Sequence, residues 1–268
     1  LKFSSLYHKV FTMSKNKRFD MLGDRLKTLE RIETEARFPP NNYLYVRIDG
    51  RSFSKFTKGL TRPYDTRLSS LMQLVTASLV KEFNAVIGYT QSDEISLVIN
   101  NTYEKSCIFE AKKQKLISTI ASHAAAVFNA NLADVIPEKD PLKTGKYPSF
   151  DCRIFPVTTA SEATNAILWR EHDAIKNSVS MSAHHYFSHK ELHGVNTAVM
   201  KDMLKTKASV IWEDYPKFFK SGSYFKRVVY NKVMPDGTLI PRSKVAEVNL
   251  TLSEILEHDD RIKSALGD

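Results

Sequence analysis

The order of predicted elements indicates an α+β protein with a ferredoxin-like βαββαβ core. Two stretches with helical spacing of apolar residues alternate with four short apolar runs bounded by turn-forming residues. The two middle runs flank a four-residue turn at 91–94, which predicts two neighbouring strands. A chain of 268 residues with 42% apolar side chains is large enough to bury such a core.

The chain begins its regular structure with a helix and a strand. Residues 20–36 are predicted to be helical, and prolines and asparagines at 39–42 end this helix. Its apolar residues recur near a helical period, at Met21, Leu22, Leu26, Leu29 and Ile32. Residues 43–48 then form a short strand that stops at Asp49 and Gly50.

The remaining core elements follow in order. Asp65 is a predicted N-cap for a helix that ends near Phe83 and carries an apolar stripe. Residues 86–90 and 95–100 are strands, residues 103–132 contain a second long helix, and residues 150–155 are a fourth strand. We therefore divide the chain into an N-terminal basic extension (1–18), a catalytic core (19–157) and a C-terminal extension (158–268) packed on that core.

The C-terminal extension is predicted to be helical at first and to end in a β-hairpin. Residues 163–181 and 188–205 are helices, the second interrupted around His193 and Gly194. Strands at 228–233 and 239–241 flank the turn at 235–237 and form the hairpin.

The bulk composition favours a nucleic-acid partner over other classes. The formal net charge is +9, although a basic surface also serves solubility alone. Two cysteines, Cys107 and Cys152, fit neither a disulfide framework nor a zinc cluster, which indicates a reducing compartment. We expect no membrane span. The first nineteen residues contain no acid, so cytoplasmic and mitochondrial locations both remain open.

Two carboxylates are the strongest candidates for chemistry. In a βαββαβ sheet the first and third strands are antiparallel neighbours, so Asp49 at the end of one lies beside Asp93 at the start of the other. Carboxylate and carbonyl oxygens suit Mg²⁺, and the carbonyl of Gly50 is a further candidate ligand. Alone, the Asp-Gly sequence at 49–50 or the Ser-Asp-Glu sequence at 92–94 would be explained as a simple turn.

Polar residues around this pair could hold a polyphosphate. The backbone amides of Arg51, Ser52, Phe53 and Ser54 are a candidate phosphate-binding nest after Gly50. Glu94 is a third candidate catalytic residue, which could ligate a second ion, orient the residues that ligate the metal, or face solvent. A solvated face or a phosphate-binding patch explains the cations Lys55, Lys58, Arg62 and Arg67 equally well.

Three further groups have competing interpretations. Trp169, Arg170, Asp173 and Asn177 share a helix face, on which Trp169 is expected in the core. Arg170 and Asn177 could meet a nucleotide, and helix capping and packing explain them equally. His184, His185 and His189 lack a matching acid or cysteine, so we reject a metal site there. The segment 215–227 interleaves cations with aromatic residues, which suits RNA binding or a half-buried strand.

Ordered motifs along the chain resemble one family. These are Arg47 to Phe53 (RIDGRSF), Arg62 to Asp65 (RPYD), Gln91 to Glu94 (QSDE), Phe150 to Arg153 (FDCR) and Trp169 to Asp173 (WREHD). In this order and spacing they are similar to the tRNA(His) guanylyltransferase family, over about residues 19–177.

The resemblance implies a fold and a reaction. Members have a polymerase-like palm and add nucleotides to the 5′ end of tRNA, with ATP activating a 5′-monophosphate and GTP or another NTP then attacking. Two Mg²⁺ ions would be held here by Asp49, Gly50 and Asp93, and nucleotide by residues 49–54, Ser92 and Asp93. Members are commonly homotetramers.

Two departures from the family pattern affect the expected substrate. Ala174 stands where guanylyltransferases proper carry a histidine, and Arg62 replaces a lysine. Both fit the Thg1-like branch, whose members repair truncated tRNA 5′ ends in the 3′-to-5′ direction against a template. A tRNA(His)-specific guanylyltransferase and a non-catalytic RNA-binding palm are the alternatives.

Overall fold

The structure, a computed structural model, describes residues 15–101, 108–235 and 237–250. Most of the predicted N-terminal extension lies outside these residues, and so does Cys107. The helix predicted within residues 103–132 is confirmed as α5, which spans Lys113–Val135. Residues 108–111 form a short 3-10 helix before it, and residues 102–107 lie outside the described ranges.

Six strands form one antiparallel sheet. They are β1 (Asn42–Gly50), β2 (Ile87–Gln91), β3 (Glu94–Asn101), β4 (Phe150–Val157), β5 (Ser223–Val233) and β6 (Leu239–Val248). Their order across the sheet is β4-β1-β3-β2-β5-β6, and every neighbouring pair is antiparallel. The predicted pairing of the first and third strands is confirmed. The C-terminal hairpin β5–β6 adds two strands to the same sheet at the β2 edge.

Helices cover both faces of this sheet. The α-helices of the described residues are α2 (Lys15–Thr34), α3 (Phe53–Phe56), α4 (Thr66–Glu82), α5 (Lys113–Val135), α6 (Pro141–Thr144), α7 (Ala160–Tyr186), α8 (His189–Leu192), α9 (Thr197–Ala208) and α10 (Lys217–Lys220), and of these α4, α5 and α7 pack on the sheet. The carboxylate of Asp65 accepts a hydrogen bond from the Arg67 amide at 3.0 Å, which confirms the predicted N-cap of α4. The predicted helical break is also confirmed, because α8 ends at Leu192 and α9 begins at Thr197.

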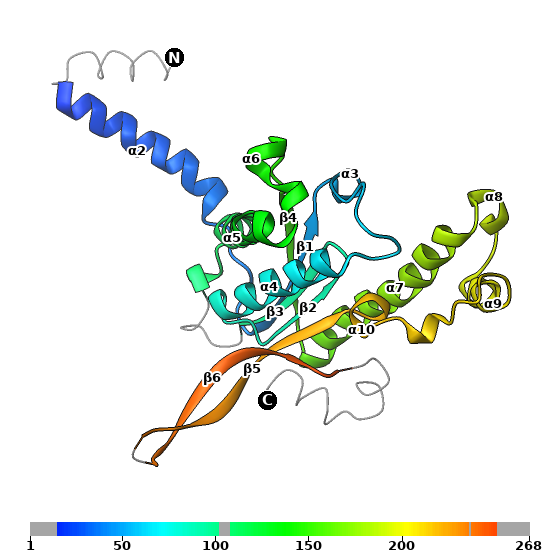
Figure 1. The fold of residues 1–268 in the computed structure, drawn as a ribbon. Coiled ribbons are helices and arrows are strands. Elements are labelled where there is room, and N and C mark those ends of the chain that lie inside the picture. Colours follow the sequence, from blue (N-terminus) through cyan, green and yellow to red (C-terminus); the bar gives the residue numbers. More distant parts are fainter. Residues whose placement is uncertain (1–14, 102–107, 236, 251–268) are drawn as a thin grey trace.

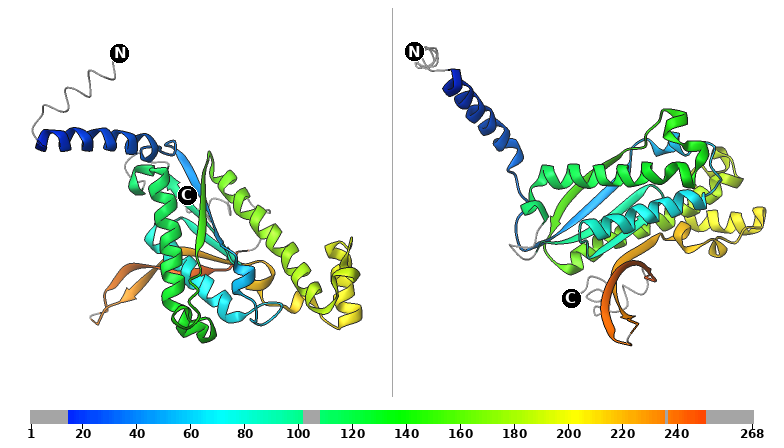
Figure 2. Two further views of the ribbon diagram at one scale, coloured as in Figure 1. Left: turned by 90° about the horizontal axis from the view of Figure 1, so that it is seen from above. Right: turned by 60° about the vertical axis from the view of Figure 1, so that its left-hand side comes forward.

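The two faces of the sheet are covered differently. Figure 2 shows α4 and α5 on one face and α7 crossing the other. Under α4 and α5 lies the main apolar core, which includes Ile48 and Leu97 from the sheet together with Leu79 and Phe128 from the helices. Under α7 lies a smaller cluster dominated by the tyrosines Tyr45, Tyr89 and Tyr224.

Two elements extend away from this body, as Figure 1 shows. One is the β5–β6 ribbon, and the other is α2, which meets the body near α5. The predicted helix of α2 is confirmed, but its apolar stripe is not buried. Its side chains are exposed by 45%, 42%, 51%, 56% and 68% at Met21, Leu22, Leu26, Leu29 and Ile32. Periodicity alone could not reveal that this face is exposed among the residues that the structure describes.

Helix α5 has one property that the sequence analysis did not anticipate. By length and composition it could cross a membrane, although core helices often have the same character. Five of its apolar side chains are fully buried in the main core: Leu116, Ile120, Ala124, Phe128 and Leu132. Burial of this face against the sheet accounts for the apolar composition of α5.

Candidate active site

The ends of β1 and β3 bring the two predicted carboxylates together. Asp49 is the register partner of Glu94, and the Gly50 amide donates to the Asp93 carbonyl at 3.1 Å. On its other side Asp49 is the register partner of Asp151 on β4. The predicted juxtaposition of Asp49 and Asp93 is therefore confirmed, and it follows from the antiparallel pairing of the strands.

Close packing of Phe53 requires glycine at position 50. A Cβ atom at Gly50 would lie 2.4 Å from the Phe53 ring, which is nearer than real contacts allow. Phe53 is itself buried among the rings of Phe56, Phe128 and Phe150, at centroid distances of 5.1, 5.5 and 5.1 Å. The turn after Asp49 is thus held by the main core.

The predicted phosphate-binding nest needs one correction. The Arg51 amide donates to the Ser149 carbonyl at 2.9 Å, so it is already engaged in the sheet. Ser52 adopts a left-handed conformation with φ of 57°, and α3 starts directly after it. Only the amides of Ser52, Phe53 and Ser54 remain as candidate phosphate donors, because the strand pairing extends further than the sequence indicated.

A cavity of about 500 Å³ opens beside the two carboxylates. Its lining includes most of the predicted site: Asp49, Phe53, Ser54, Arg62, Ser92, Asp93, Glu94 and Asn177. Gly50, Arg51 and Ser52 are not among the lining residues. A cavity of this size falls within the usual range for small-molecule and cofactor sites.

The electrostatics of Asp93 fit a cation ligand. Burial raises its pKa above the ordinary value, and the nearby charge of Asp49 raises that pKa further. The Ser92 hydroxyl donates to Asp93 Oδ1 at 3.1 Å and favours the charged form. The carboxylates of Asp49 and Asp93, next to the Gly50 carbonyl, are a donor set that suits a hard divalent cation.

Glu94 is held by a buried arginine from the opposite layer. Arg170 on α7 donates from Nε to Glu94 Oε1 at 2.6 Å and from Nη2 to Oε2 at 2.9 Å. Its Nη1 donates to Asp173 at 2.7 Å. Arg170 and Glu94 are only 9% and 7% exposed. This bidentate pair fixes α7 against the end of β3, and it favours an orienting role for Glu94 over solvent exposure.

The prediction that Trp169 lies in the core is wrong. Its side chain is 50% exposed and lies against the guanidinium groups of Arg170 and Arg47, which are 4.7 and 5.8 Å from the ring. Trp169 is exposed because the part of the sheet beside it is charged: Arg47 on β1 pairs with Arg153 on β4. A cation–π contact suits an indole ring on such a charged surface.

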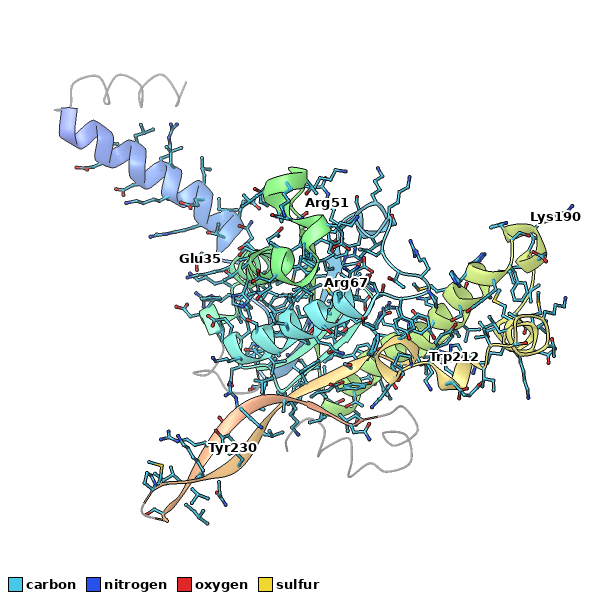
Figure 3. All side chains as sticks on the ribbon, in the orientation of Figure 1. Glu35, Arg51, Arg67, Lys190, Trp212 and Tyr230 are labelled. Atoms are coloured by element: carbon cyan, nitrogen blue, oxygen red, sulfur yellow. The ribbon has the colours of Figure 1, made fainter. Side chains whose placement is uncertain are left out.

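The four cations of the predicted patch have different environments. Arg67, at the start of α4 in Figure 3, forms ion pairs of 2.8 Å with both Asp65 and Glu138, so it is a structural residue. Arg62 lines the cavity, whereas Lys55 and Lys58 are exposed outside it. Of the four, only Arg62 is placed to meet a ligand in the cavity.

An aromatic wall of the cavity was missed by sequence reasoning. Phe218 and Phe219 of α10 contact Tyr64 at centroid distances of 5.4 and 4.7 Å, and all three line the cavity. Further along the same segment, Tyr224 and Phe225 are buried in β5, as the half-buried-strand interpretation predicted. The aromatic content of 215–227 was a signal, but its partner Tyr64 is remote in sequence.

Candidate metal-binding side chains are not clustered in the part of the chain that the structure describes. Within the described ranges, no group of three or more His, Cys, Asp or Glu side chains is arranged to hold a metal ion. The rejection of a metal site at His184, His185 and His189 stays a prediction. Asp49 and Asp93 are only a pair, so any ion there needs oxygens from the backbone, water or substrate.

Comparison with known proteins identifies the family. A profile described as Thg1, tRNAHis guanylyltransferase, matches residues 24–158, just over half of the chain. The chain belongs to the tRNA(His) guanylyltransferase family. A probable tRNA(His) guanylyltransferase of Dictyostelium discoideum is 28% identical over 260 residues, which cover 90% of this chain and 94% of that protein. The family is one of nucleotidyltransferases.

Solved structures agree with this assignment. A bacterial Thg1-like protein in complex with ATP matches with a TM-score of 0.77 and 31% identity, over 91% of this chain and 98% of that one. A bacterial Thg1-like protein in complex with GTP matches with a TM-score of 0.72 and 28% identity, over 92% and 99%. The α+β palm-like fold expected from the sequence is therefore confirmed.

Proposed function

We propose that this family member extends the 5′ end of tRNA in the 3′-to-5′ direction, with the opposite strand as template. Its substrates are 5′-truncated tRNAs, ATP for activation, and GTP or another NTP for addition. The observation that carries the proposal is the pairing of Asp49 and Asp93 at neighbouring strand ends beside a nucleotide-sized cavity. The strong positive charge of the chain supports a polyanionic partner.

Two Mg²⁺ ions are the cofactors in this proposal. Asp49 and Asp93, which line one end of the cavity, would hold them together with the carbonyl of the adjoining Gly50, because these are hard oxygen donors. When bound, such ions neutralise phosphate charge and align the attacking and leaving oxygens. Glu94, fixed by Arg170, orients the strand end that carries Asp93.

Other residues of the chain bind and orient the nucleotide. In activation, an oxygen of the RNA 5′-monophosphate attacks the α-phosphorus of ATP, and pyrophosphate leaves. In the nucleotide-addition step, the 3′-hydroxyl of an NTP attacks the activated 5′ phosphorus, and AMP leaves. Arg62 and Asn177, which line the cavity, and the amides of Ser52 to Ser54 would orient these phosphates.

Ala174 favours general repair over addition to tRNA(His) alone. Ala174 lies on α7, is 3% exposed and lines the cavity. In the pattern of the guanylyltransferases that act on tRNA(His), this position is a histidine. A methyl group offers no hydrogen bond there. A site without that donor relies on base pairing with the template to choose the nucleotide.

The deciding experiment compares three acceptors. Labelled GTP and ATP are supplied with a 5′-truncated tRNA of another identity, with tRNA(His) lacking its extra 5′ residue, and with an intact tRNA. We expect transfer to the truncated tRNA, with the added base set by the opposite strand. Transfer to tRNA(His) alone would establish the dedicated guanylyltransferase instead, and binding without transfer would establish the non-catalytic RNA-binding palm.

We also propose a homotetramer. The apolar stripe of α2 supports self-association, because among the residues that the structure describes it exposes five large apolar side chains on a projecting helix. Light scattering on the purified chain tests the assembly. A monomer at micromolar concentration contradicts it.

A further inference from the structure

A second hollow adjoins the main cavity on the far side of the Arg62–Pro63 loop. Its volume is about 320 Å³. It is lined by Arg62, Pro63, Ser180, Met181, His184 and His185. The first four of these residues also line the main cavity, so the two spaces are neighbouring parts of one groove. We call the second space the distal hollow.

One face of α7 forms a wall along the whole groove. Arg170, Asn177 and His184 recur every seven residues, so they lie on one side of the helix two turns apart. At 1.5 Å per residue, Arg170 and His184 are about 21 Å apart along the helix axis. Ala174 and Met181 lie between them, so hydrogen-bonding side chains alternate with apolar ones along the groove.

The two ends of the groove differ in charge. Asp49, Asp93 and Glu94 line the end at the sheet. The residues that line the distal hollow include no acid and instead offer a guanidinium, a hydroxyl and two imidazoles. An imidazole donates at least one N–H whether neutral or charged, and all these donors suit phosphate oxygens.

We propose that the distal hollow binds the phosphate backbone of the acceptor RNA, close to the 5′ end that reacts. This inference rests on the proposed function. The NTP of the addition step reacts through its 3′-hydroxyl, so its triphosphate, like the next phosphate of the RNA, lies away from the reacting phosphate. Among the side chains that line the distal hollow, Arg62 is the one permanent cation, beside hydroxyl and imidazole donors. This set suits the single charge of an RNA phosphodiester better than the several charges of a triphosphate.

The chain offers a matched control for this surface. His184 and His185 line the distal hollow, whereas His189 and His193 lie just beyond it and line neither space. The rings of His184 and His189 are only 6.0 Å apart, and all four histidines are exposed. The variants H184A/H185A and H189A/H193A therefore remove the same side chains from the same region and should both fold.

The test measures equilibrium binding of a 5′-truncated tRNA and, separately, of ATP alone. For H184A/H185A we expect the Kd for tRNA to rise about tenfold, as for the loss of one or two hydrogen bonds to phosphate. The Kd for ATP should not change, and H189A/H193A should match the unmodified protein. A Gln pair, H184Q/H185Q, keeps side-chain N–H donors and should recover part of the affinity.

Three results would overturn the inference. They are unchanged tRNA affinity in H184A/H185A, an equal loss in both double variants, and a parallel loss of ATP affinity. The second would indicate diffuse surface attraction, and the third a nucleotide subsite. Failure of the proposed function is distinguishable, because an unmodified protein that binds tRNA as described but transfers no nucleotide rejects that function alone.

Discussion

The two faces of the central sheet differ in what they bury. The face under α4 and α5 buries a continuous apolar core that includes Leu79 and Phe128. The face under α7 buries polar groups as well: the Glu94–Arg170 ion pair, and Tyr224, whose hydroxyl donates to Glu171. Burial raises the pKa of Tyr224 well above its ordinary value.

This difference separates the residues that hold the fold from those that hold the site. Apolar burial contributes stability without regard to direction, whereas a buried polar pair loses most of its value if either partner moves. The candidate site lies where the polar face reaches the end of β1 and β3. Changes on the two faces should therefore separate stability from activity.

The largest effect is expected at the carboxylates themselves. Asp93→Ala or Asp49→Ala should lower nucleotide addition by about a thousandfold or more, because charge on the reacting phosphates is no longer neutralised. Stability should stay equal or rise slightly for Asp93→Ala, because burial disfavours its charge. Single-turnover transfer and urea unfolding measure the two quantities, and a fully active Asp93→Ala variant contradicts the site.

The next effect concerns the ion pair under α7. Arg170→Ala leaves Glu94 buried without its cation and should cost about 3–5 kcal/mol of unfolding free energy. The double variant Glu94→Leu/Arg170→Met should recover stability but not activity if the pair positions the site. Recovery of both would show that the pair is only structural.

A change in the apolar core should have the opposite signature. Leu79 is fully buried in the last turn of α4, whereas the cavity lies at the first turn of that helix. Leu79→Ala should cost about 2–5 kcal/mol of unfolding free energy and leave kcat unchanged at temperatures where the protein is folded. A large fall in kcat at temperatures below the unfolding transition would contradict the division of stability and activity between the two faces of the sheet.

The smallest effect is expected at the N-cap of α4. The Arg67 guanidinium holds the pKa of Asp65 at about 2, below the ordinary value of 3.8. This stabilisation is fully present above the ordinary pKa and is lost as pH falls through about 2. Asp65→Asn should therefore destabilise by about 1 kcal/mol at neutral pH. The difference in unfolding free energy from the unmodified protein should narrow in acid, and a constant difference would exclude the charge as its cause.

Local patterns in the sequence were sufficient for the elements and for the carboxylate pair. Strand order alone placed Asp49 beside Asp93, since antiparallel pairing leaves little freedom in register. Contacts between remote layers could not be predicted in this way. Glu94 and Arg170 are 76 positions apart, and Tyr64 meets Phe219 only because α10 returns to the cavity.

Burial was also harder to predict than periodicity. The stripe on α2 has the spacing of a core helix yet remains exposed, and Trp169 lies over arginines and not in the core. Periodicity reports which side chains share a face, but it does not report what that face meets. Only the tertiary arrangement decides between burial, a charged surface and a free face.

The contact between Gly50 and Phe53 has a consequence for how this site can change over time. Any side chain at position 50 would occupy space that the Phe53 ring already fills. A substitution at Gly50 would thus be tolerated only after residue 53 had become smaller, and that first change would open a void among the rings of Phe56, Phe128 and Phe150. Strong epistasis between the two positions follows, with the intermediate genotypes less fit than either end point.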